Sequence, residues 1–405
     1  MPPIARRRFA SMVMTLLLVA TSASCPGPTE KEEPTSAAGG PCGTVIAAPQ
    51  PSRSAGEESL VVYSHQDALW LYDVSANRVR QIKSGIASGD RAAPQFLDAQ
   101  HVTFVERREE DKLFPFSRDS LHRMDLGTGD EQELLRVNAM ILSYRWSLDR
   151  SQLVYEVASS ELRMDGGQRV PFSVNYLCSY DVAGRRTSDI RRLEYVVGRG
   201  GDESNERRIT WSPSGDAILL VDTIQPTMHV AVVDSRGQDL VRAQEGTFAR
   251  WLDEQTIMYR EANRLDADGK LRKGRWFTLN VVTAERKPFG FPNGASRPEI
   301  SPDGRLIAFD DADPEDPSTY IYERATGASR LLVRGYGAPI WLSDQVVAVT
   351  AGGPCPPRTE CNNFWTPLGR TIGVDVRRGS RERLAMPTTG GPYSADADVL
   401  LVKAS

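Results

Sequence analysis

The sequence predicts an all-β protein whose main part is a single β-propeller. Seven four-stranded blades fit it most simply, with six or eight as alternatives. A turn followed by a short apolar strand recurs seven times from Leu60 onward, and a second kind of turn alternates with it. The spacing between like elements starts at roughly 40 residues, the length of one propeller blade. A β-sandwich is the competing fold, but it does not require two distinct turns in strict alternation.

The first repeated element is clearest in two copies. Trp211-Ser212-Pro213-Ser214-Gly215 precedes the apolar run Ala217–Val221, and Ile300-Ser301-Pro302-Asp303-Gly304 precedes Leu306–Phe309. Pro-Asp-Gly favours a turn because proline presets one backbone angle and glycine tolerates the left-handed conformation. The other five copies begin at Phe96, Trp146, Trp251, Trp341 and Tyr393.

The second repeated element is an apolar strand that ends in an acidic or amide residue, followed by a turn. Asp125-Leu126-Gly127-Thr128-Gly129 and Glu323-Arg324-Ala325-Thr326-Gly327 show it most fully. An Asp or Asn side chain can accept a hydrogen bond from the backbone two residues on, which closes such a turn. The remaining turns of this kind open at Asp73, Asp181, Asp234, Asn280 and Asp375.

The copies at Trp211 and Ile300 resemble the WD40-like repeat of TolB-type propellers, and the resemblance covers about residues 60–402. It implies a periplasmic propeller that binds other envelope proteins. TolB itself has six blades and a separate N-terminal domain, for which this chain has no room. Fold and compartment therefore follow from the resemblance, and specific partners do not.

Residues 1–24 are predicted to be a signal peptide. They contain the basic segment Arg6–Arg8, the apolar stretch Met12–Ala20 and small residues just before Cys25. Small residues before a cysteine resemble a bacterial lipobox, so Cys25 is the predicted site of lipid attachment. The alternative is ordinary secretion with cleavage near Ala23. The chain is thus expected to be exported and lipid-anchored to a membrane of the cell envelope, on its periplasmic side or at the cell surface.

Residues 25–58 are predicted to be a flexible tether that carries the lipidated cysteine, and 59–405 the propeller. The tether is rich in Pro, Ser, Ala, Gly and Glu, so it cannot bury enough apolar surface to offset the entropy of ordering. Thr44–Ile46 is the exception, and it could add an edge strand.

Four cysteines remain if Cys25 takes lipid, an even number in an oxidising compartment. Cys355 and Cys361 are close enough in sequence to staple one loop, and they are the predicted disulfide. A Cys42–Cys178 bridge would then follow by elimination only. Cys-x5-Cys without a nearby histidine is a poor zinc pattern, so no metal site is expected.

The charge argues against nucleic acid as a partner. The whole chain has a formal charge of −4, and removing the three arginines of residues 1–24 changes it to −7. A net negative surface works against binding to phosphate backbones or anionic lipids. Contact with the membrane is expected through the lipid anchor alone.

Long insertions are predicted to gather on one face of the propeller. Four join the second and third strands of a blade, one joins a fourth strand to the next blade, and antiparallel alternation puts both kinds of connection on the same face. Long loops on a rigid scaffold commonly carry binding sites. Phe114, Phe116, Phe364 and Trp365 are candidate aromatic anchors, or they pack their own loops. The insertions are Glu106–Ser120, Ala158–Pro171, Glu261–Arg275, Ala351–Arg370 and Arg191–Arg207.

No catalytic site, cofactor or metal is expected. The sequence contains no nucleophile elbow, zinc-protease motif or phosphate loop. The histidines lie in or beside predicted strands without ligand spacing, and an acidic group is interpreted as a solvated turn in preference to a calcium site. These residues are His65, His101, His122 and His229, and Asp310, Asp311, Asp313, Glu315 and Asp316.

Together these features predict a non-catalytic envelope lipoprotein whose propeller is a binding scaffold for an envelope protein or a glycan. The alternative is an enzyme that acts on glycosides through carboxylates in the central funnel, since paired carboxyl groups can hydrolyse such bonds.

Overall fold

The structure is a computed structural model of the 405-residue chain. It divides into two compact units, Met1–Ala37 and Ala38–Ser405, and all described residues belong to the second. Among the described residues, no helix has the length and apolar character needed to span a membrane. The described residues are 40–49, 59–65, 67–86, 92–108, 118–165, 168–193, 209–224, 227–265, 268, 271–311, 317–353, 366–386 and 397–400.

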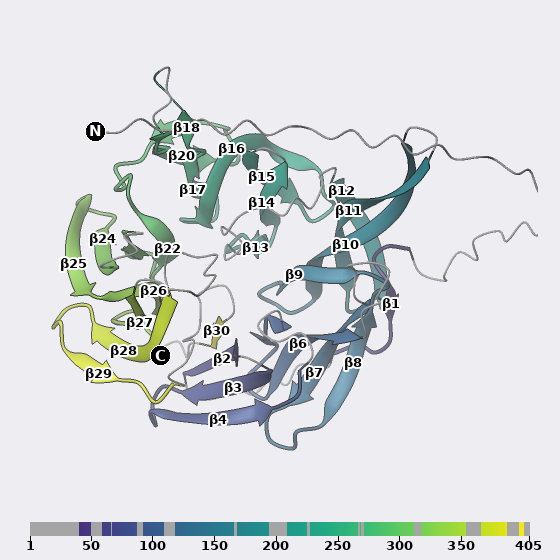
Figure 1. Cartoon of the computed structure of the whole chain (residues 1–405), viewed down its shortest axis with the longest axis horizontal. Helices are drawn as coiled ribbons and strands as arrows, with labels where there is room; N and C mark the ends of the chain where they lie inside the picture. The colour runs from purple at the N-terminus through teal and green to yellow at the C-terminus, as the bar shows by residue number, and fades with distance from the viewer. Residues whose placement is uncertain are drawn as a thin grey trace, which may run out of the picture. The chain divides into compact units, whose positions relative to one another are not determined.

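The described strands confirm the predicted all-β class and group into seven antiparallel units of four strands, which we call blades and number along the chain (Figure 1). Blade 1 contains β30 (Ala397–Leu400), β2 (Leu60–His65), β3 (Ala68–Asp73) and β4 (Arg78–Lys83). Blade 2 contains β5 (Gln95–Phe96), β6 (His101–Arg108), β7 (Arg118–Asp125) and β8 (Glu131–Arg136). Blade 3 contains β9 (Met140–Trp146), β10 (Gln152–Asp165), β11 (Gln168–Asp181) and β12 (Arg186–Leu193).

Blades 4 and 5 form one seven-stranded sheet because they share a strand. Blade 4 contains β13 (Ile209–Trp211), β14 (Ala217–Ile224), β15 (Thr227–Asp234) and the first half of β16 (Asp239–Trp251). Blade 5 contains the second half of β16, β17 (Thr256–Glu261), β20 (Trp276–Asn280) and β21 (Arg286–Pro288). Blade 6 contains β22 (Ser296–Ile300), β23 (Leu306–Asp310), β24 (Ser318–Glu323) and β25 (Ala328–Arg334). Blade 7 contains β26 (Tyr336–Trp341), β27 (Val346–Gly353), β28 (Thr366–Asp375) and β29 (Arg381–Arg383).

The shared strand β16 changes partner at Gly246. Glu245 still pairs with His229 of blade 4, whereas Gly246 pairs with Glu261 of blade 5. A Cβ atom at Gly246 would lie 2.7 Å from the carbonyl oxygen of Arg260, so only glycine fits where the strand passes from one blade to the next.

Strands from both ends of the chain close the ring. Val61 of β2 pairs with Val399 of β30, so the last described strand is the innermost strand of blade 1. The sequence alone favours an inner strand near Pro392–Ser394, which leaves one of the two apolar strands Leu60–Tyr63 and Val399–Val402 without a place. Residues 392–394 lie outside the described residues, and the strand at Val399 occupies the inner position.

The apolar core lies between neighbouring blades. Each of seven clusters of buried side chains draws on two successive blades. One joins the last blade to the first, where Tyr63 and Tyr72 of blade 1 belong to the same cluster as Ile340 and Ala348 of blade 7. A single blade cannot bury both of its faces, and this cyclic stacking covers them.

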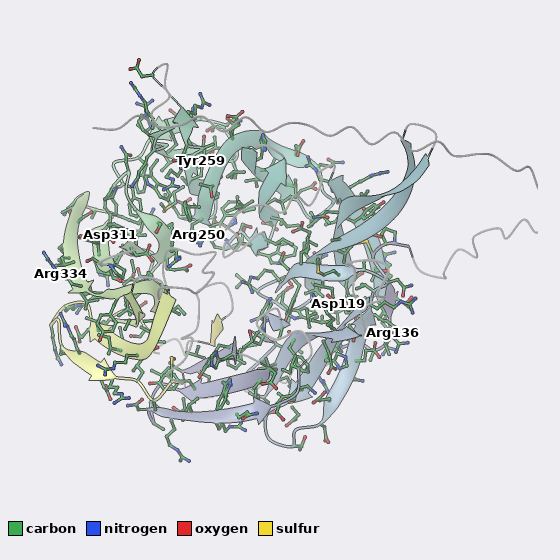
Figure 2. All side chains as sticks on the ribbon, in the orientation of Figure 1. Asp119, Arg136, Arg250, Tyr259, Asp311 and Arg334 are labelled. Carbon is green, nitrogen blue, oxygen red and sulfur yellow. A yellow bond between two sulfur atoms is a disulfide. The ribbon has the colours of Figure 1, made fainter. Side chains whose placement is uncertain are left out.

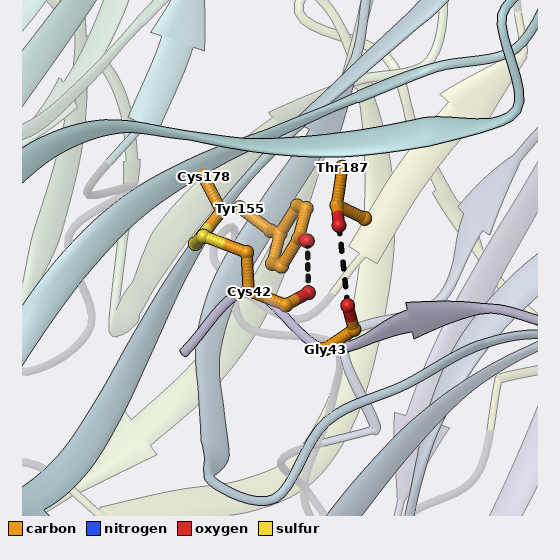
Figure 3. The surroundings of a disulfide bond; sticks show 5 residues. All are labelled: Cys42, Gly43, Tyr155, Cys178 and Thr187. Atoms are coloured by element: carbon orange, nitrogen blue, oxygen red, sulfur yellow. Dashed lines mark hydrogen bonds between the residues drawn. A yellow bond between two sulfur atoms is a disulfide. The ribbon is translucent and has the colours of Figure 1, made fainter. Parts of the chain in front are cut away.

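The segment 40–49 is packed onto the propeller, although it lies within the expected tether. Its strand β1 (Thr44–Val45) pairs with β8 as a fifth, outermost strand of blade 2, as the apolar Thr44–Ile46 suggested. Cys42 forms a disulfide with Cys178 of blade 3, which confirms the pairing reached by elimination (Figure 3). The Tyr155 hydroxyl donates a 2.5 Å hydrogen bond to the Cys42 carbonyl oxygen. The segment therefore straps blade 2 to blade 3.

Candidate functional site

The strand pairing places the ends of all the long insertions on one face, which we name the insertion face. Each of four insertions joins the second and third strands of a blade, and the fifth leads from β12 to β13. Because neighbouring strands run antiparallel, these connections emerge on the same side, opposite the short turns. The strand ends from which the five insertions start and return therefore lie on one face.

Two insertions contain strands where only loops were expected. In blade 3 the β10–β11 pairing continues to Asp165↔Gln168, whereas the pairing of β10 with β9 ends at Ala158. The stretch beyond is a two-stranded ribbon, 159–165 paired with 168–174, and the described pairing gives it no third strand. In blade 5 the insertion contains the hairpin of β18 (Arg264–Leu265) and β19 (Leu271–Arg272).

The aromatic anchors and the small disulfide predicted from sequence fall in parts of the chain that are not described. Phe114 and Phe116 belong to 109–117, and Phe364 and Trp365 to 354–365, as do Cys355 and Cys361. Cys25, the predicted lipidation site, also lies outside the described residues.

Two buried carboxylates at the insertion face hold neighbouring blades together. Asp119 of blade 2 accepts a 2.8 Å hydrogen bond from the backbone N–H of Ile141 in the innermost strand of blade 3. Asp310 of blade 6 accepts a 3.1 Å bond from the N–H of Ala338 in the innermost strand of blade 7. Buried carboxylates need such donors to remain stable, and here the donors come from the next blade.

Asp310 is one of the acidic residues considered above as a calcium ligand. Its carboxylate also accepts hydrogen bonds from the Ser296 hydroxyl and the Arg297 guanidinium. Burial raises the pKa of the Asp310 carboxyl, and the Arg297 charge opposes that rise. Asp311 accepts from the backbone N–H of Ser318. Asp310 is therefore a buried link between blades 6 and 7, and its interpretation as part of a solvated turn was wrong. Asp313, Glu315 and Asp316 lie outside the described residues.

The innermost strands of three blades begin with the same backbone irregularity. Phe248, Arg297 and Ala338 have positive φ angles of 54°, 47° and 52°, each at a shift in strand register. In blade 7 this bulge turns the N–H of Ala338 toward Asp310. A positive φ is costly for a side-chain-bearing residue, so the bonds to the neighbouring blade help to hold the bulge.

A buried ion pair lies at the inner ends of blades 5 and 6. Arg250 Nη2 is 3.2 Å from Glu299 Oε1, and 7% of Arg250 and 8% of Glu299 are exposed. In Figure 2, Arg250 lies on the inner side of its blade, nearer the middle of the ring than Tyr259. The Arg260 guanidinium stacks 4.6 Å above the Phe248 ring and donates to the Ala295 carbonyl oxygen of blade 6. These arginines fix the junction of the two blades.

The enzyme alternative required two free carboxyl groups facing each other in the central funnel. Glu299 is paired with Arg250, and Asp119 and Asp310 bind backbone donors. Within the described residues, these three buried acids are committed to holding the fold, so they do not support that particular arrangement.

Sequence analysis missed one cluster of potential ligands on the side of blade 2 that faces blade 1. One atom each of Glu106 (β6), His122 (β7) and Glu131 (β8) lie within 4.8 Å of one another. Side chains two residues apart on a strand share a face, and Ser120, the register partner of Glu106, is two residues from His122. Register was the missing signal, because the three residues lie far from any metal-binding spacing in the sequence.

No known family model matches the sequence, and no curated protein is significantly similar to it. Solved structures do resemble it. The tricorn protease matches with a TM-score of 0.53 and 11% identity over 87% of this chain and 35% of that chain. TolB from Acinetobacter baumannii matches with a TM-score of 0.40 and 14% identity over 84% of this chain and 82% of that chain. The periplasmic gluconolactonase of Pseudomonas aeruginosa matches with a TM-score of 0.46 and 15% identity. The match covers 85% of this chain and 99% of that chain.

These structures correct one prediction. The sequence led us to expect that the chain is not an enzyme, and that exclusion is wrong because the fold of this chain is also found in an enzyme, the tricorn protease. The lack of familiar motifs was an insufficient ground, since one fold can carry many unrelated sites.

The chain spans about a third of the tricorn protease, and at these identities each likeness concerns the fold alone. The cyclic stacking of four-stranded blades, from the last blade back to the first, makes this chain a β-propeller.

Proposed function

We propose that this chain is an exported cell-envelope protein, lipid-anchored through Cys25, whose propeller binds a protein partner on its insertion face. The observation that carries the proposal is that the five long insertions start and return on one face of a scaffold whose blades are locked to one another. A rigid ring with long loops on one side is a frequent arrangement for binding.

A protein is the favoured ligand because of the blade 3 ribbon. Beyond Ala158 the strand β10 has no partner on the β9 side in the described pairing, so its backbone groups form an open edge. An extended polypeptide can add to such an edge through main-chain hydrogen bonds, which a glycan cannot provide in a ladder. Phe114, Phe116, Phe364 and Trp365 are proposed anchors for the same partner.

Photo-cross-linking in intact cells tests the binding face. The cross-linking amino acid replaces the exposed Arg118 or Arg264 on the insertion face, and Ser214 in a short turn on the opposite face is the matched control. We expect a discrete protein adduct from Arg118 or Arg264 and none from Ser214. Equal adducts from both faces would contradict the proposal, and a glycosidase-sensitive adduct would replace the protein partner with a glycan.

The anchor is tested separately by membrane fractionation of a Cys25→Ser variant. Loss of the lipid should move the protein from the membrane to the soluble fraction, because a single diacylglycerol-cysteine would be its main membrane contact. Unchanged partitioning would contradict lipidation and leave the binding experiment unaffected.

A further inference from the structure

The cluster on blade 2 brings together three side chains that metal ions commonly use as ligands. Glu106, His122 and Glu131 come from three adjacent strands, with one ligand atom of each within 4.8 Å of the others. Glu106 Oε2 lies 3.5 Å from His122 Nε2. The strands themselves fix the spacing, so the ligands are already gathered without any loop closing over them.

Neighbouring residues hold the His122 ring in place beside the two carboxylates. Its ring stacks on Phe104 at 5.6 Å between ring centroids, and only 12% of its side chain is exposed. The Ser120 hydroxyl lies 2.9 Å from Nε2 and helps to orient the ring.

The cluster carries a net negative charge, which would attract a cation. Lys83 of blade 1 binds Glu131, with Nζ 2.7 Å from Oε1 and 2.8 Å from Oε2. Glu106, Glu131 and Lys83 together carry a formal charge of −1. Glu106 keeps 29% of its side chain exposed, so an ion from solvent has a path to the carboxylates.

We propose that Glu106, His122 and Glu131 bind a divalent transition-metal ion, with Zn²⁺ as the best match. One imidazole nitrogen and two carboxylate oxygens are a ligand set that zinc accepts, with a fourth position left for water or for the Ser120 hydroxyl. Lys83 competes with the ion for Glu131, and its flexible side chain can swing away when the metal enters. The ion would join three strands of blade 2 beside the junction with blade 1.

Metal binding is measured on the full chain after treatment with a chelator. Zn²⁺ is titrated by calorimetry, and Co²⁺ is used as a spectroscopic probe of nitrogen ligation. We expect one ion per chain for the unmodified protein. His122→Ala and Glu106→Gln should each weaken binding at least tenfold, and His122→Ala should also change the Co²⁺ absorption spectrum. His65→Gln, outside the cluster, is the matched control and should bind like the unmodified protein.

Lys83→Met gives an independent test because it removes the competitor and no ligand. The proposal expects Lys83→Met to bind Zn²⁺ several-fold more tightly, whereas a plain ion-pair network expects no gain. Far-ultraviolet circular dichroism checks that each variant is folded. If His122→Ala does not fold, Glu106→Gln takes its place as the ligand variant. Equal Zn²⁺ affinity of the unmodified chain, Glu106→Gln and Lys83→Met, or no binding to either the unmodified chain or Lys83→Met, would overturn the proposal.

Discussion

Two of the links between neighbouring blades differ in chemistry, one made by an indole and one by an ion pair. Between blades 3 and 4, 4 and 5, and 6 and 7, a tryptophan at the end of an innermost strand donates its indole N–H to a backbone carbonyl oxygen of the preceding blade. The bonds run from Trp211 to Arg145 at 3.1 Å, from Trp251 to Thr210 at 3.3 Å and from Trp341 to Glu299 at 2.8 Å.

Blade 6 has Ile300 at the same place in the repeat, and isoleucine has no such donor. There the ion pair Arg250–Glu299 links blades 5 and 6, and a group of aromatic rings around Phe291 fills the space between them. The difference teaches that a polar link between neighbouring blades can be supplied near this position either by an indole or by a charged pair. The two solutions differ in how they respond to the loss of one partner.

The largest loss of stability is expected at the junction of blades 2 and 3, because a tryptophan and a covalent bond both link these blades. Trp146 donates to the Thr103 hydroxyl, and Cys42–Cys178 closes a loop with a sequence separation of 136. For a loop of that size the chain-entropy account gives about 5 kcal/mol. We expect a Cys42→Ser, Cys178→Ser double variant to lose stability of that order in urea unfolding. A loss below about 1 kcal/mol would show that the strap contributes little.

The charged junction should be the more fragile of the two kinds. Glu299→Ala leaves Arg250 buried without its partner, and such a loss typically lowers the free energy of unfolding by about 3–5 kcal/mol. Replacing both residues, as in Arg250→Met with Glu299→Leu, should recover most of it, because a well-packed apolar pair avoids the cost of burying charge. Urea unfolding of the two variants side by side provides the measurement. If the double variant is as unstable as Glu299→Ala, the ion pair itself is required.

Removing the indole donor from a tryptophan junction should lower the free energy of unfolding by less than breaking the ion pair does. Trp341→Phe keeps an aromatic ring but leaves the Glu299 carbonyl oxygen without its indole donor, at a cost of about 1–3 kcal/mol. Ile300→Leu, at the same place in the repeat, changes only the shape of an apolar side chain and should cost less than about 1.5 kcal/mol. Thermal unfolding compares them, and a larger loss for Ile300→Leu would refute the importance of the indole bond.

The smallest effect should appear in the turns between third and fourth strands. Asp375 accepts backbone N–H bonds from Arg377 and Arg378, and the bond from Arg378 is the largest cause of its lowered pKa. Blade 5 uses Asn280 in the same role, accepting from Val282 and Thr283.

Because the folded-state pKa of Asp375 lies below its ordinary value of 3.8, its contribution is present above that pH and is lost as the pH falls. Asp375→Asn should therefore be slightly less stable than the unmodified protein near neutral pH and lose less stability on acidification, so that the two proteins converge at low pH. Melting temperatures measured from about pH 7 down to about pH 3 test this. Parallel pH profiles of the two proteins would contradict the assignment.

Local sequence determined the blade pattern because each turn uses only nearby residues. Ser301 and Asp303, for example, bind each other and the backbone within a few positions, so their spacing alone predicts the turn. The edge strand at Thr44–Ile46 could be foreseen for a similar reason, since it was the one apolar stretch in a polar segment.

Features that depend on register or on distant residues could not be predicted. The gathering of Glu106, His122 and Glu131 needs the register of three strands, and the role of Asp310 needs an N–H group from the next blade. The ribbon in blade 3 is different, because apolar residues alternate along both of its strands, at 162 and 164 and at 170, 172 and 174. This signal was present in the sequence and was overlooked.

By itself, then, the sequence determined the strands, their turns and the ring they build, since hydrophobic alternation and turn chemistry act over a few residues. The tertiary structure decided how the blades are joined, by indole, ion pair or disulfide. It also decided which carboxylates form bonds between the blades. The physical reason is that a buried polar group needs a partner, and in a ring of stacked blades that partner comes from the neighbouring blade.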